Sequence, residues 1–314
     1  MTLKELGNRT SHSPYSSVIV ACGENATENT SPPCSILKAS NVASQPKYSP
    51  LRYPGGKTWL IPQIRSWLNN DPTSVLVEPF AGGGTASLVA VLEGYVERAL
   101  LIERDPCVAA VWNTILSNDA EWLVEAILNF KFTIGNVRQI LRTQARNTRF
   151  LAFQTVVKNR ARRGGILADS ANLIRKGERG RGIKSRWYPD TIALRIALIY
   201  THRKQFTFLH GDGIQAISKF SNLRNTVRFF VDPPYPEMDC RRGNRLYTYN
   251  KLDHEKLFAL LDSTNGDFLL TYNDSPQVRA LTAKHKFALT LINMRGTHGL
   301  PRYEMLIRPV RQPR

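Results

Sequence analysis

The chain of 314 residues is long enough for one large domain or for a core with an inserted segment. Hydrophobic residues make up 42% and charged residues 22%, values typical of a globular protein, whereas the net charge of +18 is unusually high. No apolar run approaches the roughly 18 residues of a membrane span, so an integral membrane protein is excluded. A polyanionic partner fits the charge better than a membrane surface does.

The first 48 residues are rich in Ser, Asn, Thr and Pro and show no hydrophobic periodicity. We predict a largely disordered leader over 1–48. The four cysteines, Cys22, Cys34, Cys107 and Cys240, show no paired spacing that would indicate a metal site or a disulfide framework. Together with the missing secretion signal, they predict a reducing, cytoplasmic location.

From residue 48 onward, short apolar strands alternate with amphipathic helices, which predicts an α/β sheet. A Gly-rich loop joins the last two predicted strands into a closing antiparallel pair. The predicted helices are 58–68, 86–92, 106–116, 120–130 and 191–201, and the predicted strands are 74–79, 99–102, 206–209, 227–231, 267–272, 287–294 and 303–307.

A glycine-rich turn, Phe80-Ala81-Gly82-Gly83-Gly84-Thr85, lies between the first predicted strand and the helix that follows it. Glycines let a ligand approach the backbone, and the helix start offers free N–H groups, so the turn predicts a nucleotide-type site. The next strand ends in Glu103, about 20 residues beyond the glycines, the spacing expected of an acid that binds ribose hydroxyls.

The basic residues gather in one segment. Residues 131–190 hold 15 Lys and Arg against 3 Asp and Glu, which places +12 of the +18 there. A solvated basic face is the plainer explanation, but so strong a concentration favours nucleic acid. Within it, residues 175–184 contain only Ile183 as a core side chain and predict a mobile basic loop.

The tetrapeptide Asp232-Pro233-Pro234-Tyr235 directly follows the strand Val227–Val231, at the site-forming edge of the predicted sheet. Two prolines remove two N–H donors and leave neighbouring carbonyls as rigid acceptors. A carboxylate, a fixed carbonyl and an aromatic face are what a site needs to hold the exocyclic amine of a flat heterocycle. The alternative is an ordinary turn after a strand.

Several readings of these features compete. A nicotinamide oxidoreductase shares the glycine turn and the acid, but Ser87 stands where a third glycine is expected, and Asp232–Tyr235 is then unexplained. Pro106-Cys107 is similar to the nucleophile dipeptide of cytosine-C5 methyltransferases, yet it follows the ribose-binding acid, so we interpret Cys107 as structural. The histidines show no spacing that indicates a metal site.

Taken together, the motifs resemble those of the Dam-like DNA adenine-N6 methyltransferases. The resemblance covers about residues 49–310 and includes the order of the elements: Arg52–Lys57, the glycine turn, Glu103, Asn159–Ile166, His210–Asp212, Asp232–Tyr235 and Arg302–Ile307. The chain has Ala161-Arg162-Arg163 where the family often has Ser, Thr or Phe after Asn-Arg. That difference bears on the target sequence and not on the chemistry.

The resemblance implies a Rossmann-like S-adenosylmethionine-dependent methyltransferase sheet with a terminal antiparallel hairpin and an inserted, mainly helical target-recognition domain. The catalytic domain is expected over 49–130 and 200–310 and the insert over 131–199. The implied catalytic residues are Asp232, Pro233, Pro234 and Tyr235. The implied residues for S-adenosyl-L-methionine are Tyr53, Lys57, Phe80, Gly82, Gly84, Glu103, Asp212 and Asp232.

Lys57 suits the methionine carboxylate of that cofactor, and Asp212 its adenine amine; Asp212 equally suits the N-cap of the helix that follows it. The expected base-reading or phosphate-binding residues are Arg160, Arg162, Arg163, Arg179, Arg181 and Lys184.

The predicted activity is site-specific methylation of adenine N6 in double-stranded DNA, with the base flipped out of the helix. The alternatives are an N6-adenine methyltransferase of RNA or single strands, and a catalytically silent DNA-binding relative. A monomer is expected, with no membrane partner and no metal, and a cognate restriction endonuclease is a candidate partner.

Overall fold

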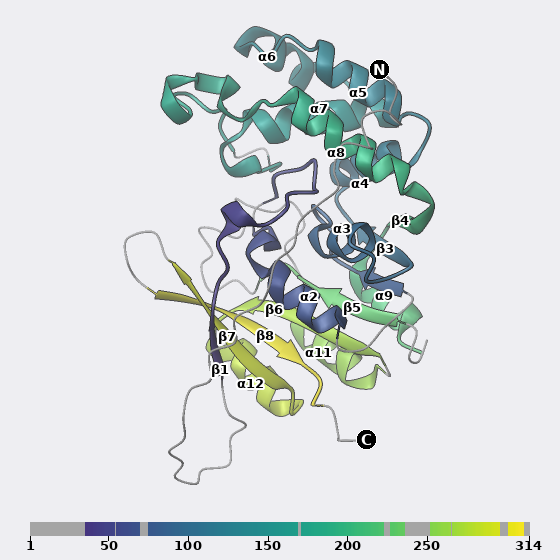
Figure 1. Cartoon of the computed structure of the whole chain (residues 1–314), viewed down its shortest axis with the longest axis vertical. Coiled ribbons are helices and arrows are strands. Elements are labelled where there is room, and N and C mark those ends of the chain that lie inside the picture. Colours follow the sequence, from purple (N-terminus) through teal and green to yellow (C-terminus); the bar gives the residue numbers. More distant parts are fainter. Residues whose placement is uncertain are drawn as a thin grey trace.

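The computed structural model describes residues 35–53, 55–69, 75–168, 171–222, 227–235, 252–264, 266–295 and 301–310. Within them an eight-stranded sheet has the order β1-β7-β8-β6-β5-β2-β3-β4 (Figure 1). The strands are β1 (Ser35–Lys38), β2 (Val75–Glu78), β3 (Arg98–Glu103), β4 (Phe206–His210), β5 (Val227–Val231), β6 (Asp267–Asn273), β7 (Ala288–Arg295) and β8 (Pro301–Arg308).

Strand pairing confirms the predicted fold class. Strands β4, β3, β2, β5 and β6 pair in parallel, whereas β8 is antiparallel to both β6 and β7. The chain runs outward through β3 and β4 and then returns to place β5 on the other side of β2. This reversal makes the sheet doubly wound, and ligands bind beyond the carboxyl ends of strands at such a switch point.

Helices cover both faces of the sheet because apolar side chains alternate along its strands. Leu76 and Leu101 belong to the core on one face, while Val77 and Leu100 belong to the core on the other. The first face is covered by α2 (Ile61–Asn69) and α3 (Thr85–Leu92), and the second by α9 (Gly213–Phe220), α11 (His254–Ser263) and α12 (Pro276–Lys284).

A layer of helices extends from one end of the sheet (Figure 1). It contains α4 (Pro106–Leu116), α5 (Ala120–Asn129), α6 (Ile134–Arg142), α7 (Thr148–Ala161) and α8 (Pro189–Thr201). Its apolar side chains continue the core of the α2–α3 face without interruption. Helix α5 packs against α8, so the helical layer includes a helix that the sequence assigned to the catalytic domain.

One expectation about order needs correction. Residues 35–38, inside the predicted leader, form β1, which pairs in parallel with β7. Residues 1–34 lie outside the described part. The basic segment 175–184 is folded into two 3-10 turns, η4 (Glu178–Gly180) and η5 (Gly182–Arg186). Ile183 is buried there, as predicted.

Among the described helices, none has both the length and the apolarity that a membrane span requires.

Candidate active site

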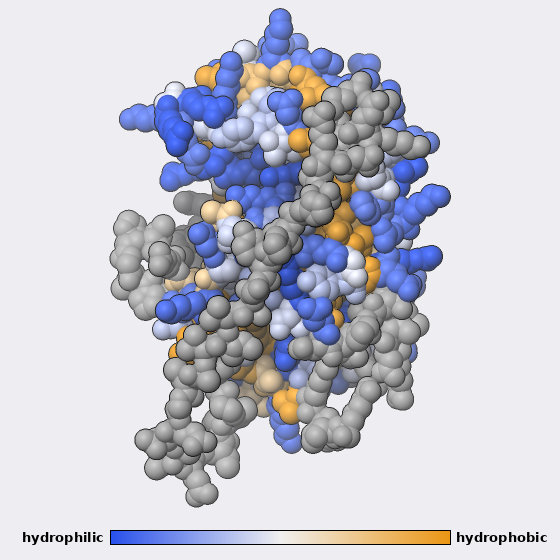
Figure 2. Space-filling model, in the orientation of Figure 1, coloured by the Kyte–Doolittle hydropathy of each residue, from blue (hydrophilic) through white to orange (hydrophobic). Residues whose placement is uncertain are grey.

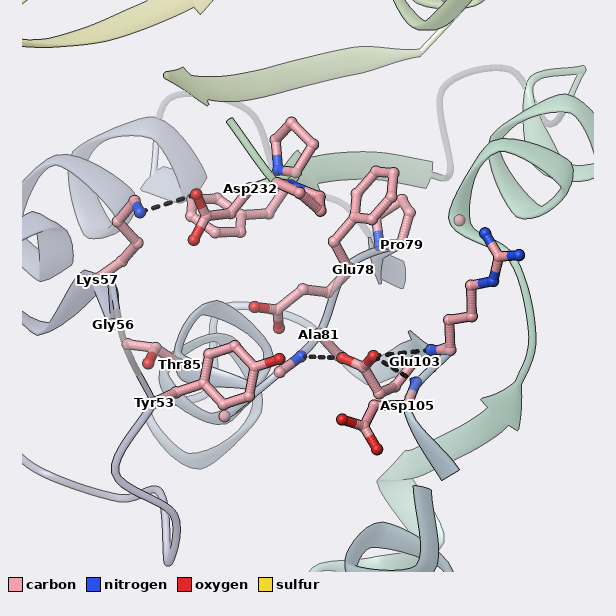
Figure 3. A pocket seen from close by; sticks show the side chains of 18 of the residues that line it. Tyr53, Gly56, Lys57, Glu78, Pro79, Ala81, Thr85, Glu103, Asp105 and Asp232 are labelled. Carbon is pink, nitrogen blue, oxygen red and sulfur yellow. Dashed lines mark hydrogen bonds and ion pairs between the residues drawn. The ribbon is translucent and has the colours of Figure 1, made fainter. Parts of the chain in front are cut away.

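Four acidic residues at strand ends line one pocket, because the carboxyl ends of parallel strands share one edge of the sheet. They are Glu78 at the end of β2, Glu103 at the end of β3, Asp212 after β4 and Asp232 after β5. Figure 3 shows Glu78, Glu103 and Asp232 around the pocket, with Tyr53 and Lys57. Of the eight residues expected to hold the cofactor, all but Gly84 line this pocket.

The glycine turn is shaped by two left-handed residues. Gly82 has φ 47° and Gly84 φ 65°, conformations that glycine adopts without strain. A Cβ on Gly82 would lie 2.8 Å from the ring of Tyr53, and one on Gly84 would lie 2.6 Å from the ring of Trp112. Gly82 therefore lets Tyr53 close over the turn, whereas Gly84 starts α3 and packs against α4.

Glu103 binds the turn as well as facing the pocket. Its Oε2 accepts from the Gly82 N–H at 2.8 Å, and its Oε1 accepts from the N–H groups of Arg104 and Asp105 at 2.8 and 2.9 Å. Burial raises the pKa of this carboxyl, and the backbone donors oppose that rise. The predicted ribose acceptor is thus also the group that ties the glycine turn to the end of β3.

Asp212 serves as the N-cap of α9. Its Oδ1 accepts from the N–H groups of Ile214 and Gln215 at 2.9 and 3.2 Å, as the structural alternative predicted. The next residue is closely surrounded, since a Cβ on Gly213 would lie 2.4 Å from the Pro79 carbonyl oxygen. Because Asp212 also lines the pocket, its contact with the cofactor adenine remains a prediction compatible with the cap.

Asp232 is held from two sides through one oxygen. Its Oδ1 accepts from the hydroxyl of Thr271 on β6 at 2.8 Å and lies 2.8 Å from the ammonium of Lys57. The parallel register of β5 and β6, which pairs Val231 with Leu270, puts Thr271 beside Asp232. The second oxygen, Oδ2, has no hydrogen-bond partner among the described residues.

Lys57 is only 3% exposed and uses all three of its N–H donors within the protein. Besides Asp232, its ammonium donates to the Gly55 carbonyl at 2.8 Å and to the Tyr235 hydroxyl at 3.0 Å. In this arrangement no donor is left for the methionine carboxylate that the sequence assigned to it. The structure instead pairs Lys57 with Asp232 and Tyr235 of the predicted catalytic motif.

Tyr235 is fixed by its hydroxyl, which donates to Glu304 Oε2 at 2.8 Å. Its ring lies 5.7 Å from that of Tyr272, measured between centroids. Burial is the main cause of the raised pKa of Glu304, with the Lys57 charge acting in the opposite direction. Pro233 and Pro234 line the pocket, whereas Tyr235 borders it through Lys57.

Sequence reasoning missed three functional candidates: Glu78, Thr271 and Glu304. Glu78 points into the pocket (Figure 3), and its Oε2 accepts from the Ser87 N–H at 2.9 Å. Burial raises the pKa of Glu78 to about 7, and the nearby charge of Asp232 adds to the rise. Each of the three is a polar residue inside or at the end of an apolar strand, a signal that could have found them.

The expected nucleic-acid residues fall into two groups. Arg163, Arg179, Arg181 and Lys184 are exposed and available to a partner. Arg160 is only 4% exposed and donates to the Pro50 carbonyl, so in this structure its side chain is not placed to read bases. The Nη1 of Arg162 is committed to the carbonyls of Leu167 and Ala168, which line the pocket.

Cys107 does not line the pocket. It is the second residue of α4, and its N–H donates to Oδ1 of the N-cap residue Asp105 at 2.8 Å. Burial raises the pKa of its thiol, which is the opposite of what a nucleophilic cysteine needs. This position agrees with its interpretation as a structural residue.

A doubly wound sheet brings a glycine turn, an acidic second strand end and Asp232 around one pocket, which is the arrangement that the motifs predicted for an S-adenosylmethionine-dependent methyltransferase. The family model of D12 class N6 adenine-specific DNA methyltransferases matches residues 53–153 of the chain. The match confirms the resemblance that the motifs indicated. It covers Tyr53, the glycine turn and Glu103, and it ends before Asp232.

Solved structures similar to this chain include further methyltransferases. A protein from Pyrococcus horikoshii described as a candidate RNA methyltransferase is 13% identical, with a TM-score of 0.37 over 87% of this chain and 91% of the other. Precorrin-6y C5,15-methyltransferase from Geobacter metallireducens is 11% identical, with a TM-score of 0.34 over 79% and 86%. An rRNA methyltransferase from Streptomyces viridochromogenes is 14% identical, with a TM-score of 0.33 over 80% and 84%.

Similarities this low do not indicate a substrate. None of the curated proteins is detectably similar to the chain in sequence.

The pocket fits S-adenosylmethionine, the cofactor of this family. The crowded position of Gly82 against Tyr53 leaves room at the turn only for a residue without a side chain, and Tyr53 and Gly82 both line the pocket. Carboxylates at the ends of β2 and β3 offer acceptors for hydroxyl and amine groups, and Phe80 adds an apolar wall. The residues that would hold the cofactor are Tyr53, Phe80, Gly82, Glu103 and Asp212.

Proposed function

We propose that this protein methylates the exocyclic N6 of adenine in double-stranded DNA. The observation that carries the proposal is the position of Asp232: it lies on the same pocket as the glycine turn and Glu103, with Oδ1 held by Lys57 and Thr271 and Oδ2 open. The family match, whose description names N6 adenine in DNA, supports this choice of substrate.

S-adenosylmethionine supplies the electrophilic methyl group when bound, so no protein nucleophile is needed. An aromatic amine is a poor nucleophile, because its lone pair is delocalised into the ring. Asp232 Oδ2 and the Pro233 carbonyl are acceptors for the two amine hydrogens. Accepting both hydrogens localises the lone pair and stabilises the positive charge that develops on nitrogen.

The fixed surroundings of Asp232 matter because orientation must be complete before the reaction. Lys57 and Thr271 hold the carboxylate through Oδ1, which leaves Oδ2 as the acceptor in the proposal. A base inside a duplex cannot reach this pocket, so the proposal includes base flipping, at a cost of roughly a few kcal/mol. The exposed arginines of the helical layer would bind the phosphates of the same duplex. The proposal also includes a cytoplasmic location, where such DNA would be found.

The test is a paired assay with radiolabelled cofactor on duplex DNA, single-stranded DNA and RNA, followed by mass spectrometry of the digested product. Label on duplex DNA recovered as N6-methyladenine is the expected result. Cys107→Ser should remain active and Asp232→Ala should not. Recovery of 5-methylcytosine, or label on RNA alone, would contradict the proposal.

A further inference from the structure

A cluster of four arginines, Arg52, Arg160, Arg186 and Arg195, lies where the helical layer meets the loop that precedes Tyr53. Two guanidinium groups, from α7 and α8, converge on consecutive carbonyls of this loop. Arg160 Nη2 donates to Pro50 O, and Arg195 Nη1 donates to Ser49 O at 3.0 Å. We call these four residues the arginine cluster.

Two hydrogen bonds between the side chain of Asn159 and the backbone of Arg52 fix the position of Arg52 in the cluster. The Asn159 side chain accepts from the Arg52 N–H at 2.9 Å and donates to the Arg52 carbonyl at 2.7 Å. Asn159 directly precedes Arg160 on α7, so the loop and the helix are joined at both residues. The guanidinium of Arg52 has no hydrogen-bond or ion-pair partner among the described residues.

The cluster is short of negative charge. Arg186 forms an ion pair with Glu178, and no carboxylate among the described residues pairs with the other three guanidinium groups. The positive charges of Arg195, Arg52 and Arg186, after burial itself, lower the pKa of Arg160 to about 9. The Nε of Arg160 is buried without a hydrogen-bond partner. Buried charge of one sign is unfavourable unless an ion of the opposite sign joins it.

A cavity of about 250 Å³ opens beside the cluster. Lys47, Ser49 and Arg52 contribute to its wall, and it shares Tyr53 and Thr85 with the cofactor pocket. An anion at Arg52 would therefore lie next to the reaction site. Figure 2 shows that hydrophilic side chains cover much of the helical layer on the face drawn there.

Tyr188 adds an aromatic surface to the same region. It is 41% exposed, it affects the pKa of Arg52, and the guanidinium of Arg181 lies over its ring at 5.3 Å from the centroid. Interleaved arginine and exposed aromatic side chains are typical of nucleic-acid surfaces, where phosphates bind the cations and bases stack on the rings.

We infer that Arg52 and Arg195, the half-buried members of the arginine cluster, bind a backbone phosphate of the nucleic acid next to the nucleotide whose base enters the pocket, while the buried Arg160 contributes only its charge. Guanidinium groups bind phosphate oxygens through paired N–H donors, and such contacts position the strand without reading its sequence. The inference rests on the proposed function for its nucleic-acid ligand. DNA and RNA both carry the phosphodiester group that the cluster would bind. Binding assays with duplex DNA and with RNA oligonucleotides distinguish the two.

The test compares Arg52→Gln and Arg195→Gln, both half-buried, with Arg138→Gln on the exposed surface of α6. Dissociation constants for a labelled duplex are measured over a range of salt, with circular dichroism to establish folding. Each cluster variant should weaken binding about 10-fold or more, the effect of one hydrogen bond to a charged group. Each should also reduce the slope of log Kd against log salt by about 1, while Arg138→Gln changes binding less.

Arg52→Lys keeps the positive charge but loses the paired N–H donors of the guanidinium group, so it should bind the duplex more tightly than Arg52→Gln and less tightly than the wild type. Inorganic phosphate should compete with the duplex for the wild-type protein more strongly than for Arg52→Gln. If both cluster variants bind like Arg138→Gln while the wild type methylates adenine, the inference is wrong and the proposed function stands. If the wild type binds duplex through the cluster yet methylates nothing, the proposed function fails alone; a wild type that binds no nucleic acid overturns both.

Discussion

The ammonium of Lys57 lies 2.8 Å from Asp232 Oδ1, which joins the segment before α2 to the end of β5. The two residues lie far apart in the sequence, and their sequence motifs gave them separate tasks. In the folded protein they form one unit with Tyr235 and Glu304. The ammonium of Lys57 therefore helps to orient the carboxylate of Asp232, which we propose to be catalytic. Replacing Lys57 should for this reason disturb Asp232.

Lys57→Met and Asp232→Asn should interact strongly in a double-mutant cycle. Each single change leaves a partner without its counter-charge, whereas the double variant removes both charges. We expect a coupling of about 1–3 kcal/mol in the free energy of unfolding, measured by urea denaturation. The 23% exposure of Asp232 screens the pair and favours the lower end of this range. Additive effects would show that the two groups are energetically independent.

Asp232→Ala should reduce the rate of methylation by about 10²–10³-fold, the usual effect of removing one preorganised transition-state partner. Thr271→Val should have a smaller effect, about 10-fold, because it removes one of two contacts that orient the carboxylate. Single-turnover kinetics with saturating cofactor measure both. Thr271→Ser, which keeps the hydroxyl, serves as the control. Half of the wild-type rate in Asp232→Ala is incompatible with the mechanism.

Glu103→Ala should weaken S-adenosylmethionine binding by at least about 10-fold, since it removes an acceptor and leaves the N–H groups of Gly82, Arg104 and Asp105 without their partner. Calorimetry gives the affinity. Glu97→Ala is the matched control, because Glu97 is an exposed glutamate just before the other end of β3. Wild-type affinity in Glu103→Ala would remove this residue from the cofactor site.

Glu78 should make the protein less stable as the pH rises from about 4.5 to 7. Its pKa in the folded state is raised from 4.5 to about 7, so the folded state holds a proton that the unfolded state releases in this window. The loss is complete above pH 7 and corresponds to about 3 kcal/mol.

Glu78→Gln should remove this pH dependence and melt higher than the wild type at pH 8, because a glutamine oxygen can still accept from Ser87. Melting temperatures between pH 5 and 8 measure the difference, with the exposed Glu125→Gln as the control. Parallel pH profiles for the wild type and Glu78→Gln would contradict the assignment.

Replacing Arg179, Arg181 and Lys184 together with Gln should weaken binding to every DNA sequence and flatten its salt dependence, because exposed cations of this kind contact phosphates. Arg163→Ala should instead change which sites are methylated, since a bidentate arginine contributes about 1–3 kcal/mol of discrimination. Methylome sequencing of cells that express each variant separates the two outcomes. An unchanged motif and an unchanged extent of methylation would exclude this segment as the reader.

The sheet could be predicted from sequence because its signals are local. Apolar runs in β2, β3, β5 and β6 are bounded by glycine, proline or acid, and the glycine turn lies at the expected strand end. The helix predicted over 106–116 has the same bounds as α4. Helices α6 and α7 were not predicted individually. Only Val137 of α6 is buried, and the buried face of α7 includes the polar residues Gln154, Asn159 and Arg160, which interrupt its apolar pattern.

The site could be predicted only in part, because partners across the fold leave no local pattern. Nothing near Lys57 in the sequence indicates that Asp232 and Tyr235 complete its coordination. Likewise, Arg160 has the appearance of a nucleic-acid residue until the Pro50 carbonyl is known to lie against it. Residue types predicted the chemistry of the pocket, whereas burial decided which cations remain available to a partner.

The short strand β1 has a practical consequence for protein production. It pairs in parallel with β7 through Ser35–Lys38 and covers the outer edge of the hairpin. A shortened version that starts at Tyr48, where the sequence motifs begin, would leave the edge of β7 unpaired. Exposed strand edges recruit other chains. The boundary for a well-behaved truncated protein therefore lies before residue 35, even though every residue of the candidate active site lies after it.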